Sequence, residues 1–529
     1  MSDDMTFRKA SELFRSVCKC LTLTFFFVLL VACQSSTLPT APDNKVTEAA
    51  TQAAVVDTPS ASTSVPFAFD WDDRAPFQAG LVFDERAALD QLAGASVYHI
   101  DLRIADDLVH LEGRQAVRYT NQEAEPLNEV YFRLFPNLFG GATEVQAVQA
   151  NGGDVAPTYG WGNSAMRVSL SPALQPGQQA VIQMAFSVQV PTEGGGDYGI
   201  FAFIDDVLAL AHFYPMISVY DDDGWNLEIP PKTGDVVYAD SSFFVVQVTA
   251  PADLTVVASG VEIARQARDK QQQVTFAGGP MRDFYLVASR QYTAVSKQVG
   301  GTTVNSYVLP KFVDEAEIVL GHAEDALKAF GARFGGYPFT EFDVVSTPTQ
   351  ALGVEYPGIV AVALRLYDLE TGEYPPVYLE STVAHEVGHQ WFYSVVGNDQ
   401  LDEPWLDEAL TQYATLLYWG DLYGTPGADG FRSSLYERWG RVEEAQIPIG
   451  LPVRAYNGQE YGAIVYGRGP LFFEALAEEM GQQAFDAFLR DYYAAHKWGI
   501  ATTEGLKQLA EQHCGCDLTL LFAEWVYEQ

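Results

Sequence analysis

Two histidines lie four residues apart, at His385 and His389, and eighteen residues separate the second of them from Glu408. On a helix, side chains at positions i and i+4 lie one above the other, so both imidazoles can reach one ion at about 2 Å. Glu386 lies one step round the same helix, where its carboxylate can take a proton from a water on that ion. The pattern therefore predicts a zinc ion held by His385, His389 and Glu408, with Glu386 as the general base.

The flanking sequence favours a helix around each part of this ligand set. Residues 377–385 lead into the motif without glycine or proline, and residues 390–396 lead out to Gly397, where the helix is expected to end. A second run, residues 404–418, begins with proline in the first-turn position and repeats apolar residues at helical spacing. Glu408 interrupts that apolar run, and a buried carboxylate needs a cation or hydrogen bonds. Without this context, the five-residue match would indicate only an ordinary amphipathic helix.

The residues beyond the histidines distinguish between subclasses of zinc enzyme. Phe392 and Val395 occupy the positions where a metzincin needs glycine and histidine. The eighteen-residue gap, residues 405–409 (Trp-Leu-Asp-Glu-Ala) and residues 353–355 (Gly-Val-Glu) resemble the aminopeptidase N family of gluzincins, which includes the leukotriene hydrolases. Further matches lie at residues 213–221, 224–225, 334–338 and 466–469, so the resemblance covers roughly residues 95–529.

This resemblance implies a zinc-dependent peptide hydrolase with one Zn2+ ion, most specifically an aminopeptidase that removes N-terminal residues from peptide substrates. It also implies that Tyr466 donates a hydrogen bond to the oxyanion and that Glu355 binds the substrate's free α-ammonium group. Tyr456 and Tyr461 lie close enough in sequence to compete with Tyr466. Glu355 has the alternative role of a strand residue before the turn at residues 357–358.

The sequence departs from the family pattern in two places. Tyr356 replaces the asparagine that follows the family's glutamate, and residues 207–211 lack the glutamine and glutamate of a second amine anchor. Three hypotheses therefore remain: an aminopeptidase, a hydrolase of internal peptide bonds or an epoxide at the same zinc site, and a catalytically silent, surface-anchored binding protein.

The first 33 residues resemble a bacterial lipoprotein signal. Basic residues precede the apolar run at residues 21–32, which is short for a membrane span, and Leu-Val-Ala-Cys at residues 30–33 has the form of a lipobox. Cys33 is the expected lipidation site, which would anchor the exported protein to the outer face of a bacterial membrane. A plain secretory signal or an uncleaved anchor helix is the alternative. Residues 34–65, rich in Ser, Thr, Pro and Ala, predict a flexible tether.

Composition excludes some partners and limits cross-linking. The net charge of -38, from 69 acidic against 31 basic residues, argues against nucleic acid binding. Cys514 and Cys516 are the only cysteines after Cys33. With so few cysteines the sequence predicts no disulfide framework. A bridge between these two would close a small strained ring, and their role is left open.

The remaining residues predict two domains. Residues 66–298 are expected to form a β-rich N-terminal domain, an antiparallel sandwich or saddle, because segments such as 98–104 alternate apolar and polar residues. Residues 299–529 are expected to form an α+β, thermolysin-like zinc peptidase domain with a helical C-terminal part. There, apolar residues recur at helical spacing over 316–334, and residues 342–346 predict a strand.

Overall fold

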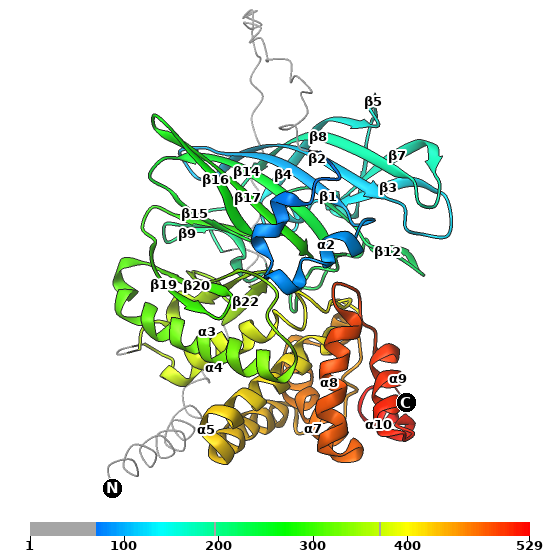
Figure 1. Cartoon of the computed structure of the whole chain (residues 1–529), viewed down its shortest axis with the longest axis vertical. Coiled ribbons are helices and arrows are strands. Elements are labelled where there is room, and N and C mark those ends of the chain that lie inside the picture. Colours follow the sequence, from blue (N-terminus) through cyan, green and yellow to red (C-terminus); the bar gives the residue numbers. More distant parts are fainter. Residues whose placement is uncertain (1–69, 195–196, 370–371, 529) are drawn as a thin grey trace, which may run out of the picture. The chain divides into compact units, whose positions relative to one another are not determined.

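The computed structural model describes residues 70–194, 197–369 and 372–528. The predicted signal, Cys33 and the predicted tether lie outside the described residues. Within the described ranges, no helix has the length and apolar character needed to cross a membrane. The chain there forms an N-terminal lobe of strands, followed by a C-terminal lobe in which helices accompany a smaller sheet (Figure 1).

The N-terminal lobe is built around an eight-stranded sheet. Its strand order is β16-β17-β14-β1-β2-β8-β4-β5, and every pair is antiparallel except β14 and β1, which are parallel. The strands are β1 (Val97–Ile104), β2 (His110–Thr120), β4 (Ala142–Ala150), β5 (Gly153–Asp154), β8 (Gln179–Gln189), β14 (Ser242–Pro251), β16 (Val261–Arg268) and β17 (Gln271–Met281). Strand β8 alternates buried and more exposed side chains along its whole length, as expected for a strand with one face on a core.

Two four-stranded sheets and a hairpin complete this lobe. Their orders are β15-β18-β10-β9, β11-β3-β7-β6 and β12-β13. The strands are β3 (Leu127–Arg133), β6 (Thr158–Gly160), β7 (Ala165–Leu174), β9 (Phe201–Ile204), β10 (Val207–Leu210), β11 (Met216–Ile217), β12 (Tyr220–Asp221), β13 (Gly224–Trp225), β15 (Thr255–Ala258) and β18 (Leu286–Ser289). The short helix α2 (Ala88–Gln91) precedes β1.

The C-terminal lobe begins with a five-stranded sheet of order β19-β20-β21-β23-β22. The strands are β19 (Thr293–Val299), β20 (Thr302–Val308), β21 (Glu341–Thr347), β22 (Gly353–Tyr356) and β23 (Ile359–Ala363). Because β19 pairs with β20 along its whole length, it belongs to this sheet. The domain boundary predicted between residues 298 and 299 therefore falls inside β19, and the five-stranded sheet begins at Thr293.

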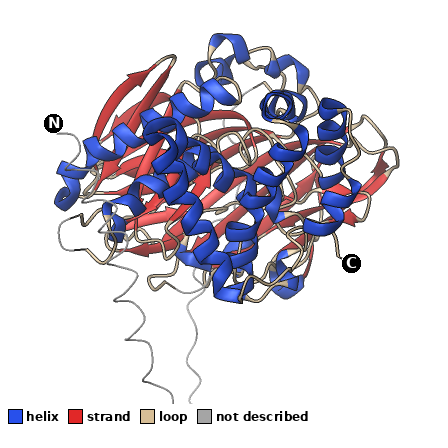
Figure 2. Ribbon diagram, turned by 90° about the horizontal axis from the view of Figure 1, so that it is seen from below, coloured by secondary structure: helices blue, strands red, loops and turns tan. Residues whose placement is uncertain are grey.

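Helices make up the rest of the lobe, and seen from below they lie in front of the strands (Figure 2). They are α3 (Val313–Arg333), α4 (Pro376–Gly388), α5 (Glu408–Trp439), α6 (Gly458–Ala463), α7 (Gly469–Met480), α8 (Gln482–His496), α9 (Thr503–Cys514) and α10 (Thr519–Trp525). Helices α3 and α4 pack against the five-stranded sheet. Helix α3 buries its apolar residues against α4 and β20, which confirms the helix predicted over residues 316–334. Helix α5 breaks at Gly424, whose φ of 65° lies in the left-handed region that favours glycine.

The two site helices differ in extent from the prediction. Helix α4 ends at Gly388 and does not continue to Gly397, because the chain turns back and the Ser394 N–H donates to the His389 carbonyl. The second helix does not start at Pro404, since residues 404–406 form a separate 3-10 turn and α5 begins at Glu408. The Asp407 side chain accepts the first backbone N–H of α5 and so caps it.

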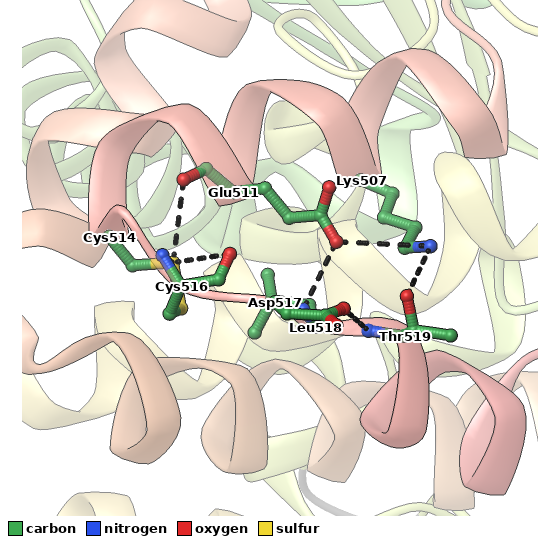
Figure 3. The surroundings of a disulfide bond; sticks show 7 residues. All are labelled: Lys507, Glu511, Cys514, Cys516, Asp517, Leu518 and Thr519. Atoms are coloured by element: carbon green, nitrogen blue, oxygen red, sulfur yellow. Dashed lines mark hydrogen bonds and ion pairs between the residues drawn. A yellow bond between two sulfur atoms is a disulfide. The ribbon is translucent and has the colours of Figure 1, made fainter.

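The two C-terminal cysteines, whose role the sequence leaves open, are bonded to each other. Cys514 and Cys516 form a disulfide at the end of α9 (Figure 3). Gly515 lies between them with a φ of 62°, and this left-handed turn brings the two ends of the short segment together. The Leu518 backbone N–H donates to Glu511, which joins this turn to α9. The ring closes because glycine supplies a backbone conformation that other residues rarely adopt.

Candidate active site

The three predicted ligand atoms converge at the junction of α4 and α5. The two Nε2 atoms of His385 and His389 are 3.1 Å apart, and Glu408 Oε2 lies 3.2 Å from the first and 3.4 Å from the second. Ligands at about 2.0–2.1 Å around a tetrahedral ion are about 3.3 Å from one another. Glu408 is buried, and its Oε2 faces both histidine nitrogens. The donor types, their spacing and this buried oxygen therefore fit one zinc ion.

A hydrogen bond orients the second histidine. His389 follows the last residue of α4, but its N–H still bonds to the His385 carbonyl at 3.3 Å, so both rings stay on one face. His389 Nδ1 lies 3.0 Å from the Phe392 carbonyl. A carbonyl oxygen can only accept a hydrogen bond, so Nδ1 carries the hydrogen and Nε2 keeps a lone pair for a metal.

Glu386 is held against the start of an edge strand. The side chain is buried, and a Cβ placed on Gly353 in β22 would lie 2.3 Å from Glu386 Oε1. A residue with any side chain at this position would displace the Glu386 carboxylate. Glycine at position 353 therefore allows the backbone of β22 to lie close to the proposed base, Glu386.

Glu355, two residues further along β22, lies in the same cluster. One oxygen of Glu355, one of Glu386 and one ring nitrogen of His389 all lie within 4.8 Å of one another. Glu355 is buried, and its Oε1 accepts a hydrogen bond from Gln400 Nε2 at 3.2 Å. The predicted amine anchor is thus close to the predicted base and close to a predicted zinc ligand.

The site concentrates carboxyl groups away from water. Burial raises the pKa of Glu355 to about 7 and that of Asp407 to about 8, and the nearby Glu408 adds to both increases. Burial, followed by the charge of Glu355, raises the pKa of Glu386 well above its usual range. Such increases arise where negative charges lack counter-ions. A divalent cation at the three ligands supplies positive charge where these carboxylates need it.

Tyr466 is presented by a π-helical turn, residues 464–468, between α6 and α7. Such turns are rare and are frequently found at functional sites. The Tyr466 hydroxyl donates to Glu408 Oε1, and its ring centre is 6.2 Å from that of His385. Tyr456 instead donates to the Pro448 carbonyl at 2.7 Å. Tyr461 packs edge-on against Tyr466, with ring centres 5.6 Å apart.

The N-terminal lobe contributes a residue that sequence reasoning missed. Asp235, between β13 and β14, hydrogen-bonds with the Glu408 carboxyl group, and burial raises its pKa well above the usual range. The preceding Gly234 has a φ of 87°, and a Cβ there would lie 3.1 Å from Tyr461 Oη. Asp235 lies in no recognisable motif, and only the fold brings it to Glu408. Val207–Leu210, in the segment that lacks the second amine anchor of the family, form β10, a buried apolar strand.

The N-terminal lobe also holds the chain segment that follows His389. Arg282, buried at the end of β17, donates to the carbonyls of Tyr393 at 2.7 Å and Val395 at 3.1 Å. The adjacent Asp283 accepts hydrogen bonds from the Tyr393 hydroxyl and pairs with His212 Nε2, both at 2.8 Å. These contacts fix the turn that follows the second zinc ligand.

Comparison with known proteins agrees with this geometry. Residues 319–525, which contain all three ligands, match the model of the Peptidase family M1 domain. Residues 319–525 are a Peptidase family M1 domain. A crystal structure of an M1 zinc metallopeptidase from Deinococcus radiodurans shares the fold, with a TM-score of 0.59 and 21% identity over 82% of this chain and 93% of that one. The predicted fold class, a β-rich domain followed by the M1 domain with its helical C-terminal part, is confirmed.

Sequence relatives of the M1 domain are longer proteins. Aminopeptidase 2 of Candida albicans is 25% identical over 316 residues, which is 54% of this chain and 32% of the relative. Aminopeptidase M1 of Arabidopsis thaliana is 24% identical over 303 residues, which is 54% of this chain and 34% of the relative. The match thus spans about a third of the length of these curated relatives.

Proposed function

We propose that this protein is a zinc aminopeptidase that removes the first residue from peptides. The observation that carries the proposal is the cluster in which Glu355 and Glu386 lie within 4.8 Å of His389, beside the three converging ligand atoms. A carboxylate for the α-ammonium group, at this distance from the base and the metal ligands, places the first peptide bond at the site of attack. The aminopeptidase names of the sequence relatives support the same assignment.

Each residue of the site has a separate role in hydrolysis. His385, His389 and Glu408 would hold zinc, which when bound supplies a Lewis acid that activates water near neutral pH and polarises a carbonyl. Glu386 takes the proton from the attacking water and returns it to the departing amine. Tyr466 turns its hydroxyl from Glu408 to the developing oxyanion, a bond that strengthens as charge builds up. Glu355 fixes the free N-terminus.

Hydrolysis of internal bonds is the second candidate function. The residue that favours it is Tyr356, which stands at the position where the family has asparagine. The Tyr356 ring stacks on that of Tyr285, with ring centres 3.9 Å apart. A variant of the Deinococcus protein has been solved bound to a Tyr-Ser-Ala substrate. For this chain we therefore place removal of the first residue from a free N-terminus ahead of hydrolysis of internal bonds.

Two matched peptides test the assignment. Zinc-loaded protein is incubated with a peptide bearing a free N-terminus and with its N-acetylated form, and the products are identified by mass. Release of single residues from the free peptide, with at least about a hundredfold slower turnover of the acetylated form, is expected because acetylation removes the charge that Glu355 binds. Internal fragments from both peptides would support the second function, and no cleavage of either would contradict both.

We also propose that Cys33 is lipidated and tethers the enzyme to the outer face of a bacterial membrane. The support is the lipobox form of residues 30–33 and the polar tether that follows. Mass analysis of the mature N-terminus checks this proposal. An acylated Cys33 as first residue is expected, whereas an uncut leader or an unmodified thiol would rule out the anchor.

A further inference from the structure

Gln400 lies between two carboxylates of the site. Its Nε2 donates to Glu355 Oε1 at 3.2 Å and to Asp407 Oδ2 at 2.8 Å, and the side chain is only 2% exposed. The other Asp407 oxygen accepts the Glu408 backbone N–H at 2.7 Å. One amide therefore connects the proposed amine anchor to the cap of the helix that begins with a zinc ligand.

A neutral donor suits this position for an electrostatic reason. A lysine or arginine here would orient Glu355 equally well, but its positive charge would repel the incoming ammonium group and compete with it. The Gln400 amide satisfies one lone pair of Glu355 and leaves the net negative charge of the carboxylate in place. It also favours the ionised form of Glu355, since hydrogen bonding to a carboxylate opposes the effect of burial on its pKa.

We propose that Gln400 is a positioning residue for amine recognition, which holds the Glu355 carboxylate in the orientation that receives the substrate's α-ammonium group. This role rests on the proposed aminopeptidase function. Gln400 does not touch the reacting atoms. Its effect passes through Glu355, so removing the amide should weaken binding of the amine specifically.

The same loop offers a matched control. Asn398 is also a buried amide, and its Nδ2 donates to the Glu403 carbonyl at 3.0 Å. Gln400→Met and Asn398→Leu each replace a buried amide by an apolar side chain of similar size. Both remove buried hydrogen bonds from one loop, but only the first removes a bond to Glu355. Gln400→Asn is a gentler second variant, because it keeps an amide but shortens the side chain by one methylene.

Two inhibitors separate amine recognition from zinc binding. Leucine hydroxamate and its counterpart without the amine, 4-methylpentanohydroxamic acid, present the same zinc-binding group and the same side chain. The ratio of their inhibition constants therefore reports the contribution of the amine alone. It is measured for wild type, Gln400→Met, Gln400→Asn, Asn398→Leu, Glu355→Gln and the double variant Glu355→Gln/Gln400→Met, with zinc content checked for each.

The wild type is expected to prefer the amine, and Gln400→Met and Gln400→Asn to lose about 10- to 100-fold of that preference, the usual effect of a hydrogen bond to a charged group. Asn398→Leu should keep the wild-type ratio. In the Glu355→Gln background, Gln400→Met should change the ratio by less than about twofold, because its effect requires Glu355.

Failure of this role is distinguishable from failure of the proposed function. A wild-type protein that shows no preference for the amine would overturn both. A wild-type preference that both Gln400 variants retain would overturn the positioning role alone. The positioning role would also be overturned if Gln400→Met lowered the ratio of inhibition constants equally in the wild-type and Glu355→Gln backgrounds. Gln400 would then act by a route that does not involve the Glu355 carboxylate.

Discussion

Glu386→Gln is expected to abolish peptide hydrolysis while the protein keeps its zinc. Glutamine has nearly the same shape as glutamate but cannot accept a proton from water, so the base is lost and the three ligands are unchanged. Turnover should fall on the order of 10²- to 10⁴-fold, the usual contribution of a general base. Steady-state kinetics with a free-amine peptide, alongside metal analysis of the same sample, measures both effects.

A second buried glutamate on α4 provides the control. Glu380 accepts hydrogen bonds from Tyr418 at 2.9 Å and Tyr423 at 2.6 Å. Glu380→Gln makes the same chemical change on the same helix and retains a carbonyl oxygen that can accept these bonds, so it should leave turnover close to that of wild type. Full turnover by Glu386→Gln would contradict the role assigned to this residue, and so would an equal loss in both variants.

Tyr466→Phe is expected to lower turnover far more than it weakens substrate binding. The hydroxyl interacts with charge that is present only in the transition state, so its removal should cost about 2–4 kcal/mol in kcat with little change in KM. In the resting enzyme this hydroxyl donates to Glu408. The π-helical turn that carries Tyr466 places the donor beside the metal ligands before substrate arrives.

The two neighbouring tyrosines test the specificity of this assignment. Tyr456→Phe loses only the hydrogen bonds of a hydroxyl that binds the Pro448 carbonyl and should retain wild-type kcat. Tyr461→Phe removes a buried hydroxyl next to Tyr466 that has no hydrogen-bond partner in the described residues, and its effect on kcat should be small. A large loss in Tyr461→Phe with none in Tyr466→Phe would transfer the oxyanion role to Tyr461.

The sequence was sufficient for the part of the site that depends on local spacing. His385 and His389 share a helix face because they are four residues apart, and the capped start of α5 brings Glu408 to them. The position of Glu355 followed from a family resemblance, since nothing in its local sequence requires a site role. His385, His389 and Glu408 could be predicted because each lies within a short, recognisable pattern.

The residues that could not be predicted reach the site through tertiary structure. Asp235 comes from a loop of the N-terminal lobe, and Gln400 joins Glu355 to Asp407 across two elements that are distant in sequence. The π-helical turn around Tyr466 also depends on packing, because residues 464–468 give no local signal for it. In the same way, the boundary predicted between residues 298 and 299 falls inside β19, because strand periodicity does not reveal which sheet a strand joins.

A zinc titration of the metal-free protein tests the central claim most directly. Protein stripped with a chelator is mixed with increasing zinc, and release of the first residue from a free-amine peptide is followed. The three ligands form one site, so activity should be absent without zinc, rise linearly and reach its plateau at one zinc ion per chain. Full activity in the chelated protein, or a plateau that needs two ions per chain, would contradict a single-zinc aminopeptidase built on His385, His389 and Glu408.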